Sequence, residues 1–420
     1  MVHPAITPAA VPVPILLLLA LTTAASSCDT ESPAGNPARE TLSNGATLVR
    51  YPDLPAIDSV GPEVTDVRID LRFGSREGDD SNLTFGNIRG VQAASDGTIY
   101  VLDYQAAEVR VFGPDGEYLR TIARRGEGPG EIAEANGILL SGDTLLWIHD
   151  YAQNRIEGVD PAGQEIRWFT KPIFGYGYIW DGAFDRQGRY WKETEHRETD
   201  ELDRGEPGPG LLSSTSRVYF KSHDLSTEHV DSVHMGETTG RAYRSAADWG
   251  TQIPFDPSDN HVVNPPGGFW SVNTGSYRLT RTDDGGDTLL VIEAALPGIP
   301  VTSDDRSAYV ESRVEREPEY RRDFEAVAAL MPDFKPILHG ILVDDQDRLW
   351  VRRIVPPDAS PFFDLFSQDG DYLGSVRLAF QPGYRYWIVH GAIYTWIADE
   401  VGVQYVVRAP LARADQHREP

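Results

Sequence analysis

Short runs of alternating hydrophobic and polar residues fill most of this chain, and turn-forming residues separate the runs. Residues 99–103 (IYVLD) and 108–112 (EVRVF) show the pattern clearly, with turns at 95–97 (SDG) and 114–116 (PDG). Apolar runs of this length bounded by Asp-Gly turns predict β-strands that are joined as hairpins. We therefore expect an all-β protein.

The strand pattern repeats along the chain. Residues 90–112 align without a gap with residues 137–159, and the first half of the unit returns at residues 339–351. A period of roughly 45 residues built from four short strands is typical of a β-propeller blade. The repeat therefore predicts a propeller, in which the first strand of each blade lines a central axis.

The number of blades follows from the length of the repeating region. About six periods fit between residues 61 and 412 once two irregular insertions are set aside. The first insertion, about residues 196–215, is rich in Glu, Asp, Gly and Pro. We predict a six-bladed propeller; a seventh blade is the alternative if residues 235–260 form a degenerate unit. Residues 63–73 are expected to pair with blade 6 and close the ring.

The second insertion is expected to be helical and to lie between blades 4 and 5. Residues 303–332 are dense in Glu, Arg and Ala. Ser303 followed by two Asp residues is a favourable helix start, whereas a proline interrupts a helix. Two short helices are therefore predicted, with a break at Pro318 and an end at Pro332.

The N-terminal region indicates export and a lipid anchor. The apolar run at residues 15–21 is too short to span a bilayer but fits a signal peptide, expected over residues 1–27. The sequence before Cys28, the single cysteine, resembles the bacterial lipoprotein signal, so Cys28 is the expected lipidation site. We expect residues 28–60 to be a disordered tether and residues 413–420 to be a tail.

Charge narrows the range of partners. The chain has 64 acidic and 38 basic residues, for a net charge of −26. This charge argues against nucleic acid as a ligand and against membrane contact other than through the lipid anchor. A small polar ligand or another protein of the bacterial cell envelope is the expected partner, on the periplasmic side or at the cell surface.

A family resemblance agrees with this picture. Residues 124–132 (RRGEGPGEI) follow a blade that ends in a Pro-Asp-Gly hairpin. This combination resembles bacterial six-bladed β-propeller lipoproteins related to NHL-repeat proteins, closely over blades 1 and 2 and more distantly elsewhere. The resemblance implies the fold and export rather than an activity.

A polar residue recurs where each predicted inner strand begins, and these residues are the candidate site. They could line a water-filled channel, or they could bind a small polar or anionic ligand with Arg89 and His339 as donors. The candidates are Arg89, Asn136, Asp181, Asn260, His261, His339 and Arg385.

The leading function is therefore a non-catalytic binding or scaffold module without a cofactor. The alternative is a lactonase-like hydrolase or lyase, since six-bladed enzymes of that kind hold a divalent cation on the axis. Asn136, Asp181 and Asn260 have oxygen atoms suited to Ca²⁺, although a set with one carboxylate carries little charge for such a site. No catalytic residue is assigned, because the chain lacks the GxSxG, HExxH and CxxC motifs.

Overall fold

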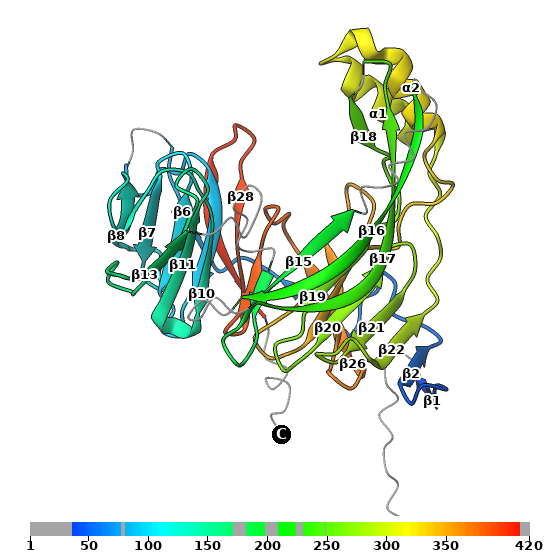
Figure 1. The fold of residues 1–420 in the computed structure, drawn as a ribbon, viewed down its shortest axis with the longest axis horizontal. Helices are drawn as coiled ribbons and strands as arrows, with labels where there is room; N and C mark the ends of the chain where they lie inside the picture. Colours follow the sequence, from blue (N-terminus) through cyan, green and yellow to red (C-terminus); the bar gives the residue numbers. More distant parts are fainter. Residues whose placement is uncertain are drawn as a thin grey trace, which may run out of the picture. The chain divides into compact units, whose positions relative to one another are not determined.

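The computed structural model describes residues 36–76, 80–170, 182–197, 209–223, 230–247 and 249–411. The strands form six sheets, and each sheet contains three to five antiparallel strands that are consecutive in the chain (Figure 1). The fold is a six-bladed β-propeller, as the repeat predicts.

Blades 1 to 3 contain the strands that follow the N-terminal region in sequence. Blade 1 consists of β5 (Ile88–Ala93), β6 (Ile99–Asp103), β7 (Glu108–Phe112), β8 (Tyr118–Arg125) and β9 (Glu131–Ile132). Blade 2 consists of β10 (Ala135–Ser141), β11 (Leu145–Asp150), β12 (Arg155–Val159) and β13 (Glu165–Thr170), with the short helix η1 (Gly142–Thr144). Blade 3 consists of β14 (Gly182–Phe184), β15 (Tyr190–Arg197), β16 (Gly210–His223), β17 (Val230–Arg244) and β18 (Gly250–Gln252).

Blades 4 to 6 each recruit strands from the N-terminal region. Blade 4 consists of β19 (Asp259–Val263), β20 (Phe269–Asn273), β21 (Arg278–Thr282) and β22 (Thr288–Ala294), joined by β2 (Thr47–Tyr51) and β1 (Ala38–Thr41). Blade 5 consists of β23 (Leu338–Val343), β24 (Leu349–Arg353), β25 (Phe362–Phe366) and β26 (Tyr372–Leu378), joined by β3 (Val64–Val67). Blade 6 consists of β27 (Trp387–Val389), β28 (Ala392–Ala398), β29 (Gln404–Pro410) and β4 (Leu71–Phe73).

Strand β4 closes the ring, because it completes blade 6 by antiparallel pairing with β29. The predicted pairing of residues 63–73 with blade 6 is therefore right for β4, whereas β3 pairs in parallel with β26 of blade 5. The sequence analysis predicts that residues 38–51 belong to the disordered tether. In the structure they form the hairpin β1–β2 on the edge of blade 4. This part of the expected tether belongs to the propeller, since Val49 and Tyr51 are buried in its core.

An apolar cluster joins every pair of neighbouring blades. Tyr100 and Ile138 share one cluster between blades 1 and 2, and Trp350 and Ile393 share another between blades 5 and 6. Tyr394 of blade 6 packs with blade 1, so the last blade contacts the first. The remaining pairs are joined in the same way. The recurring aromatic residues therefore pack between blades, as expected for large apolar side chains on second strands.

The long strands of blade 3 and the helical insertion form one structure, which we call the arm. Strands β16 and β17 are long, and the end of β17 and the residues around β18 pack against α1 (Ser303–Val314), η5 (Pro318–Tyr320) and α2 (Arg321–Ala329) (Figure 1). Residues 235–260 thus complete blade 3 and its exit, and they form no seventh blade. The break at Pro318 is confirmed, but the N-cap of α1 is Thr302, whose hydroxyl accepts a hydrogen bond from the Asp305 amide.

Candidate functional site

Three of the predicted site residues occupy one backbone position in three different blades. In β5, β10 and β23, the pairing with the second strand shifts by one residue, and the extra residue is Arg89, Asn136 or His339. A β-bulge places the extra residue outside the register of the ladder and redirects its side chain. The sequence repeat therefore identified a structural equivalence at these positions.

Two other candidates have contacts between blades. The Asn260 Oδ1 accepts a hydrogen bond of 2.9 Å from the Ile341 amide of blade 5. The His261 side chain, 8% exposed, lies beside the Phe220 ring, and its Nδ1 is 3.4 Å from an Oε2 of Glu193. Asn260 and His261 thus join blade 4 to its two neighbours. Asp181, the remaining acid of the set, lies outside the described residues.

Four basic residues lie on or beside the first two strands of blades 1, 5 and 6, and we call them the basic group: Arg89, His339, Arg352 and Arg385. Arg352 lies 5.9 Å from the ring centroid of Tyr386, so it reaches from blade 5 to blade 6. Partial burial and the positive charge of Arg352 lower the pKa of His339 below its ordinary value of 6.5. Arg89 lies over the Tyr104 ring, and its Nε is buried with no hydrogen-bond partner among the described residues.

The described residues contain no cluster of side chains that would support the metal-binding alternative. Among them, no group of three or more His, Cys, Asp or Glu side chains is arranged to hold a metal ion. Of the three residues proposed for Ca²⁺, Asn260 already uses its side-chain oxygen for the Ile341 amide. Asn136 is buried at 8% exposure.

A feature that the sequence analysis missed recurs in the first turns of blades 3 and 5. The Asp344 carboxylate accepts hydrogen bonds from the Arg348 Nε at 2.7 Å and from the Trp350 Nε1 at 2.8 Å. Its other oxygen accepts from the backbone amides of residues 346 and 348. Asp185, Arg189 and Trp191 of blade 3 make the same four bonds. We call this arrangement the Asp-Arg-Trp clasp, and its sequence signal is the shared spacing DxQxRxW.

Blade 4 has the same turn without the clasp. Residues 264–270 read NPPGGFW, so Asn264 and Gly268 replace the aspartate and the arginine. Asn264 instead forms a double amide pair with Gln368 of blade 5, and the Gly268 amide donates to the Asp284 carboxylate at 2.6 Å. Only glycine fits at position 268, because its φ is +78° and a Cβ would lie 1.9 Å from the Thr282 carbonyl oxygen.

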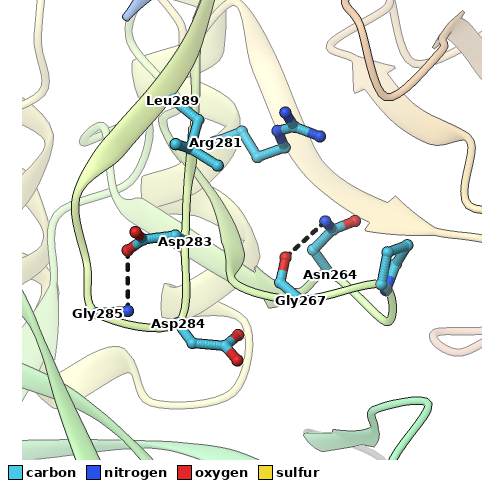
Figure 2. A pocket seen from close by; sticks show the side chains of 8 residues that line it. Asn264, Gly267, Arg281, Asp283, Asp284, Gly285 and Leu289 are labelled. Carbon is cyan, nitrogen blue, oxygen red and sulfur yellow. Dashed lines mark hydrogen bonds between the residues drawn. The ribbon is translucent and has the colours of Figure 1, made fainter. Parts of the chain in front are cut away.

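A pocket of about 430 Å³ opens at this turn (Figure 2). The turns at residues 264–267 and 283–285 form its walls, together with Arg281 and Leu289. Arg281 donates from Nη1 to the Gln368 Oε1 at 3.0 Å, and its Nε is buried without a partner among the described residues. Partial burial lowers the pKa of Arg281, while the charge of Asp369 acts in the opposite direction.

Comparison with known proteins agrees with the fold. A protein-family model described as DUF5128, 6-bladed beta-propeller, matches residues 65–157, which span blade 1 and most of blade 2. No curated protein matches the chain. No helix in the described ranges is long and apolar enough to cross a membrane.

Several solved structures are similar to the chain at low identity. One is a Bacteroides fragilis protein described as a "putative exported protein", with 10% identity and a TM-score of 0.43 over 83% of this chain and 99% of that one. A duf4221 family member from Bacteroides vulgatus has 11% identity and a TM-score of 0.42 over 81% and 97%. Virginiamycin B lyase from Staphylococcus aureus has 12% identity and a TM-score of 0.38 over 77% and 95%. Identities this low carry no ligand or activity over to this chain.

Proposed function

We propose that this protein is an extracytoplasmic binding module, anchored by lipid at Cys28, which captures a small anionic ligand with its basic group. The support for export is the apolar run at residues 15–21 followed by the single cysteine. The support for binding rather than chemistry is the composition of the basic group, whose four members are hydrogen-bond donors and include no hydroxyl or thiol nucleophile.

The basic group carries the proposal. In a chain with 26 excess negative charges, the Arg89 and Arg352 guanidinium groups form no ion pair with any acidic side chain of the described residues. A partly buried cation without a counter-ion is costly, and an anionic ligand would supply the missing charge. The convergence of these side chains on one ligand remains a prediction.

Binding of phosphate monoesters and small dicarboxylates, measured by calorimetry with the purified protein, tests the proposal. We expect Arg352→Gln and Arg89→Gln each to weaken binding about tenfold, the loss of one charge-assisted hydrogen bond. Arg316→Gln, an exposed arginine of the arm, is the matched control and should change nothing. Binding should strengthen as the pH falls through the lowered pKa of His339, because protonation of the imidazole adds a positive charge.

Two results would contradict the proposal. One is the absence of measurable binding to every anion of the panel. The other is equal affinity of the Arg352→Gln and Arg316→Gln proteins. The anchor is tested separately, since Cys28→Ser should move the protein from the membrane fraction to the soluble fraction of the cell envelope.

A further inference from the structure

A buried charged residue lies beside each of the three bulges of the candidate site. It is the last residue of the second strand, and it pairs with the inner-strand residue that comes just before the bulge. The residue is Asp103 in blade 1, Asp150 in blade 2 and Arg353 in blade 5, with 1%, 0% and 5% exposure. A charge that is buried at this position is well placed to fix the backbone of the bulge.

In blades 1 and 2, the aspartate is bonded to residues that are close to it in the chain. Asp103 accepts hydrogen bonds from the backbone amides of residues 86 and 87, which lead into β5. Asp150 accepts in the same way from the amides of residues 133 and 134, which lead into β10. A carboxylate that holds two consecutive amides fixes the chain where it enters the inner strand. These two bulges therefore depend on local contacts.

Blade 5 has an arginine at this position, and one of its partners comes from a distant part of the chain. The Arg353 Nε and Nη2 donate to the two carboxylate oxygens of Asp364 at 2.6 and 2.8 Å. The Arg353 Nη1 donates at 2.7 Å to the carbonyl oxygen of Pro55, which is 298 residues away in the sequence. Pro55 belongs to residues 52–59, which lie between β2 and β3 and which we call the strap.

A second arginine of blade 5 holds the strap in place. The Arg377 Nη2 donates to the carbonyl oxygens of Ile57 at 3.0 Å and Ser59 at 2.6 Å. The ring centroid of Phe362 lies 5.2 Å from the guanidinium carbon of Arg353 and 5.8 Å from that of Arg377. The strap is thus fixed on blade 5 by two arginines that share one buried ring.

Arg353 is directly connected to both residues that blade 5 contributes to the basic group. It follows Arg352 in β24, and its strand partner Leu338 precedes His339. The pairing passes from Leu338–Arg353 to Gly340–Arg352, and His339 is the extra residue between them. A displacement of Arg353 therefore moves both His339 and Arg352.

We propose that Arg353 is a positioning residue of the ligand site, and that the strap, through the Pro55 carbonyl, fixes His339 and Arg352 for an anionic ligand. This inference rests on the proposed function of the basic group. Attachment of the strap and binding of the anion then favour each other, because coupling between two sites is reciprocal. The N-terminal region thus contributes to binding, in addition to extending the sheets of blades 4 and 5.

The variant Arg353→Lys tests the positioning role. Lysine keeps the positive charge beside Asp364, but its single ammonium cannot reproduce the forked contact with Asp364 together with the Pro55 bond. We expect the affinity for glycerol 3-phosphate and for succinate, measured by calorimetry, to fall about threefold to tenfold.

Titration of the His339 imidazole by NMR follows the same site without a ligand. Burial and the charge of Arg352 lower the pKa of His339 in the native protein. A bulge that is no longer fixed exposes the imidazole to water and lets it move away from Arg352. The pKa of His339 should therefore rise toward 6.5 in Arg353→Lys, and a merely structural role of Arg353 would not change it.

The strap is tested without any change in β24. Arg377→Gln removes the bonds to the strap, and it should weaken anion binding about twofold to threefold and raise the pKa of His339. Arg408→Gln is the matched control, because Arg408 also bonds an aspartate and a carbonyl oxygen, namely those of Asp70 and Pro114. The two arginine side chains are 20% and 24% exposed, and the control should change neither quantity.

An unchanged pKa of His339 or an unchanged affinity in folded Arg353→Lys protein would overturn the proposal. If this variant does not fold, Arg377→Gln decides, and equality with Arg408→Gln would overturn it. If neither anion binds the native protein, the proposed function of the basic group fails. In that case, the titration of His339 still decides whether Arg353 and the strap position this residue.

Discussion

Blades 4 and 5 have the same first turn, but they satisfy its polar groups in different ways. In blade 5, Asp344 is 3% exposed and accepts four hydrogen bonds, so the turn is a closed unit. In blade 4, Asn264 pairs with Gln368 of the next blade, and the Trp270 N–H has no hydrogen-bond partner among the described residues. The comparison teaches that replacing two residues in a repeated turn can exchange a closed set of hydrogen bonds within one blade for an amide pair between two blades.

The largest expected effect comes from removal of the clasp carboxylate. Asp344→Ala leaves the Trp350 N–H and the Arg348 guanidinium without their acceptor, and it should destabilise the protein by about 3 kcal/mol or more. Asn264→Ala should cost less, about 1–2 kcal/mol, because the three hydrogen bonds that it removes join neutral groups and none involves a charge. Denaturant unfolding measures both, and equal losses would show that the two turns do not differ in energy.

The second-largest expected loss of stability comes from the backbone of the blade 4 turn. Gly268→Ala places a Cβ 1.9 Å from the Thr282 carbonyl oxygen and occupies a positive φ, so we expect a loss of about 2–3 kcal/mol. Arg348→Ala, the matched change in blade 5, should cost about 1 kcal/mol, because its side chain is 25% exposed. A Gly268→Ala protein as stable as the native one would mean that the blade 4 turn accommodates a side chain.

A smaller difference is expected between the two tryptophans. Trp350→Phe removes an N–H that donates to Asp344, whereas Trp270→Phe removes an N–H without a partner. Both variants lose similar apolar contact, so Trp350→Phe should be less stable than Trp270→Phe by about 1 kcal/mol. The reverse order, measured by denaturant unfolding in the absence of ligand, would contradict the assignment of Trp270 as an unpaired donor.

The smallest expected effect is a near balance of gain and loss at position 264. Asn264→Asp provides an acceptor for the Trp270 N–H, but it removes the two hydrogen bonds that the Asn264 Nδ2 donates to the Gln368 Oε1 and to the Gly267 carbonyl oxygen. The midpoint of denaturation should therefore stay within the equivalent of about 1 kcal/mol of the native value. A midpoint lowered beyond this range would show that the amide pair matters more than the clasp at this turn.

Much of the fold is readable from repeated residues. The alignment of blade 1 with blades 2 and 5 correctly identified the strands, the Asp-Gly hairpins and the equivalence of Arg89, Asn136 and His339. The docking of residues 38–51 on blade 4 was not readable, because a strand that joins an edge needs a partner 240 residues away and carries no repeat signal. The clasp could have been found, since its spacing occurs twice in the chain.

The sequence alone determined the architecture, since strand periodicity and turn residues act locally and recur at a regular interval. Only the tertiary structure decided which polar residues are available to a ligand. Asn260 and His261 resemble their neighbours in the sequence pattern, yet they bind adjacent blades. Whether a side chain is satisfied depends on groups that the rest of the fold supplies, and the Trp270 N–H, without a partner among the described residues, differs in this from the Trp350 N–H.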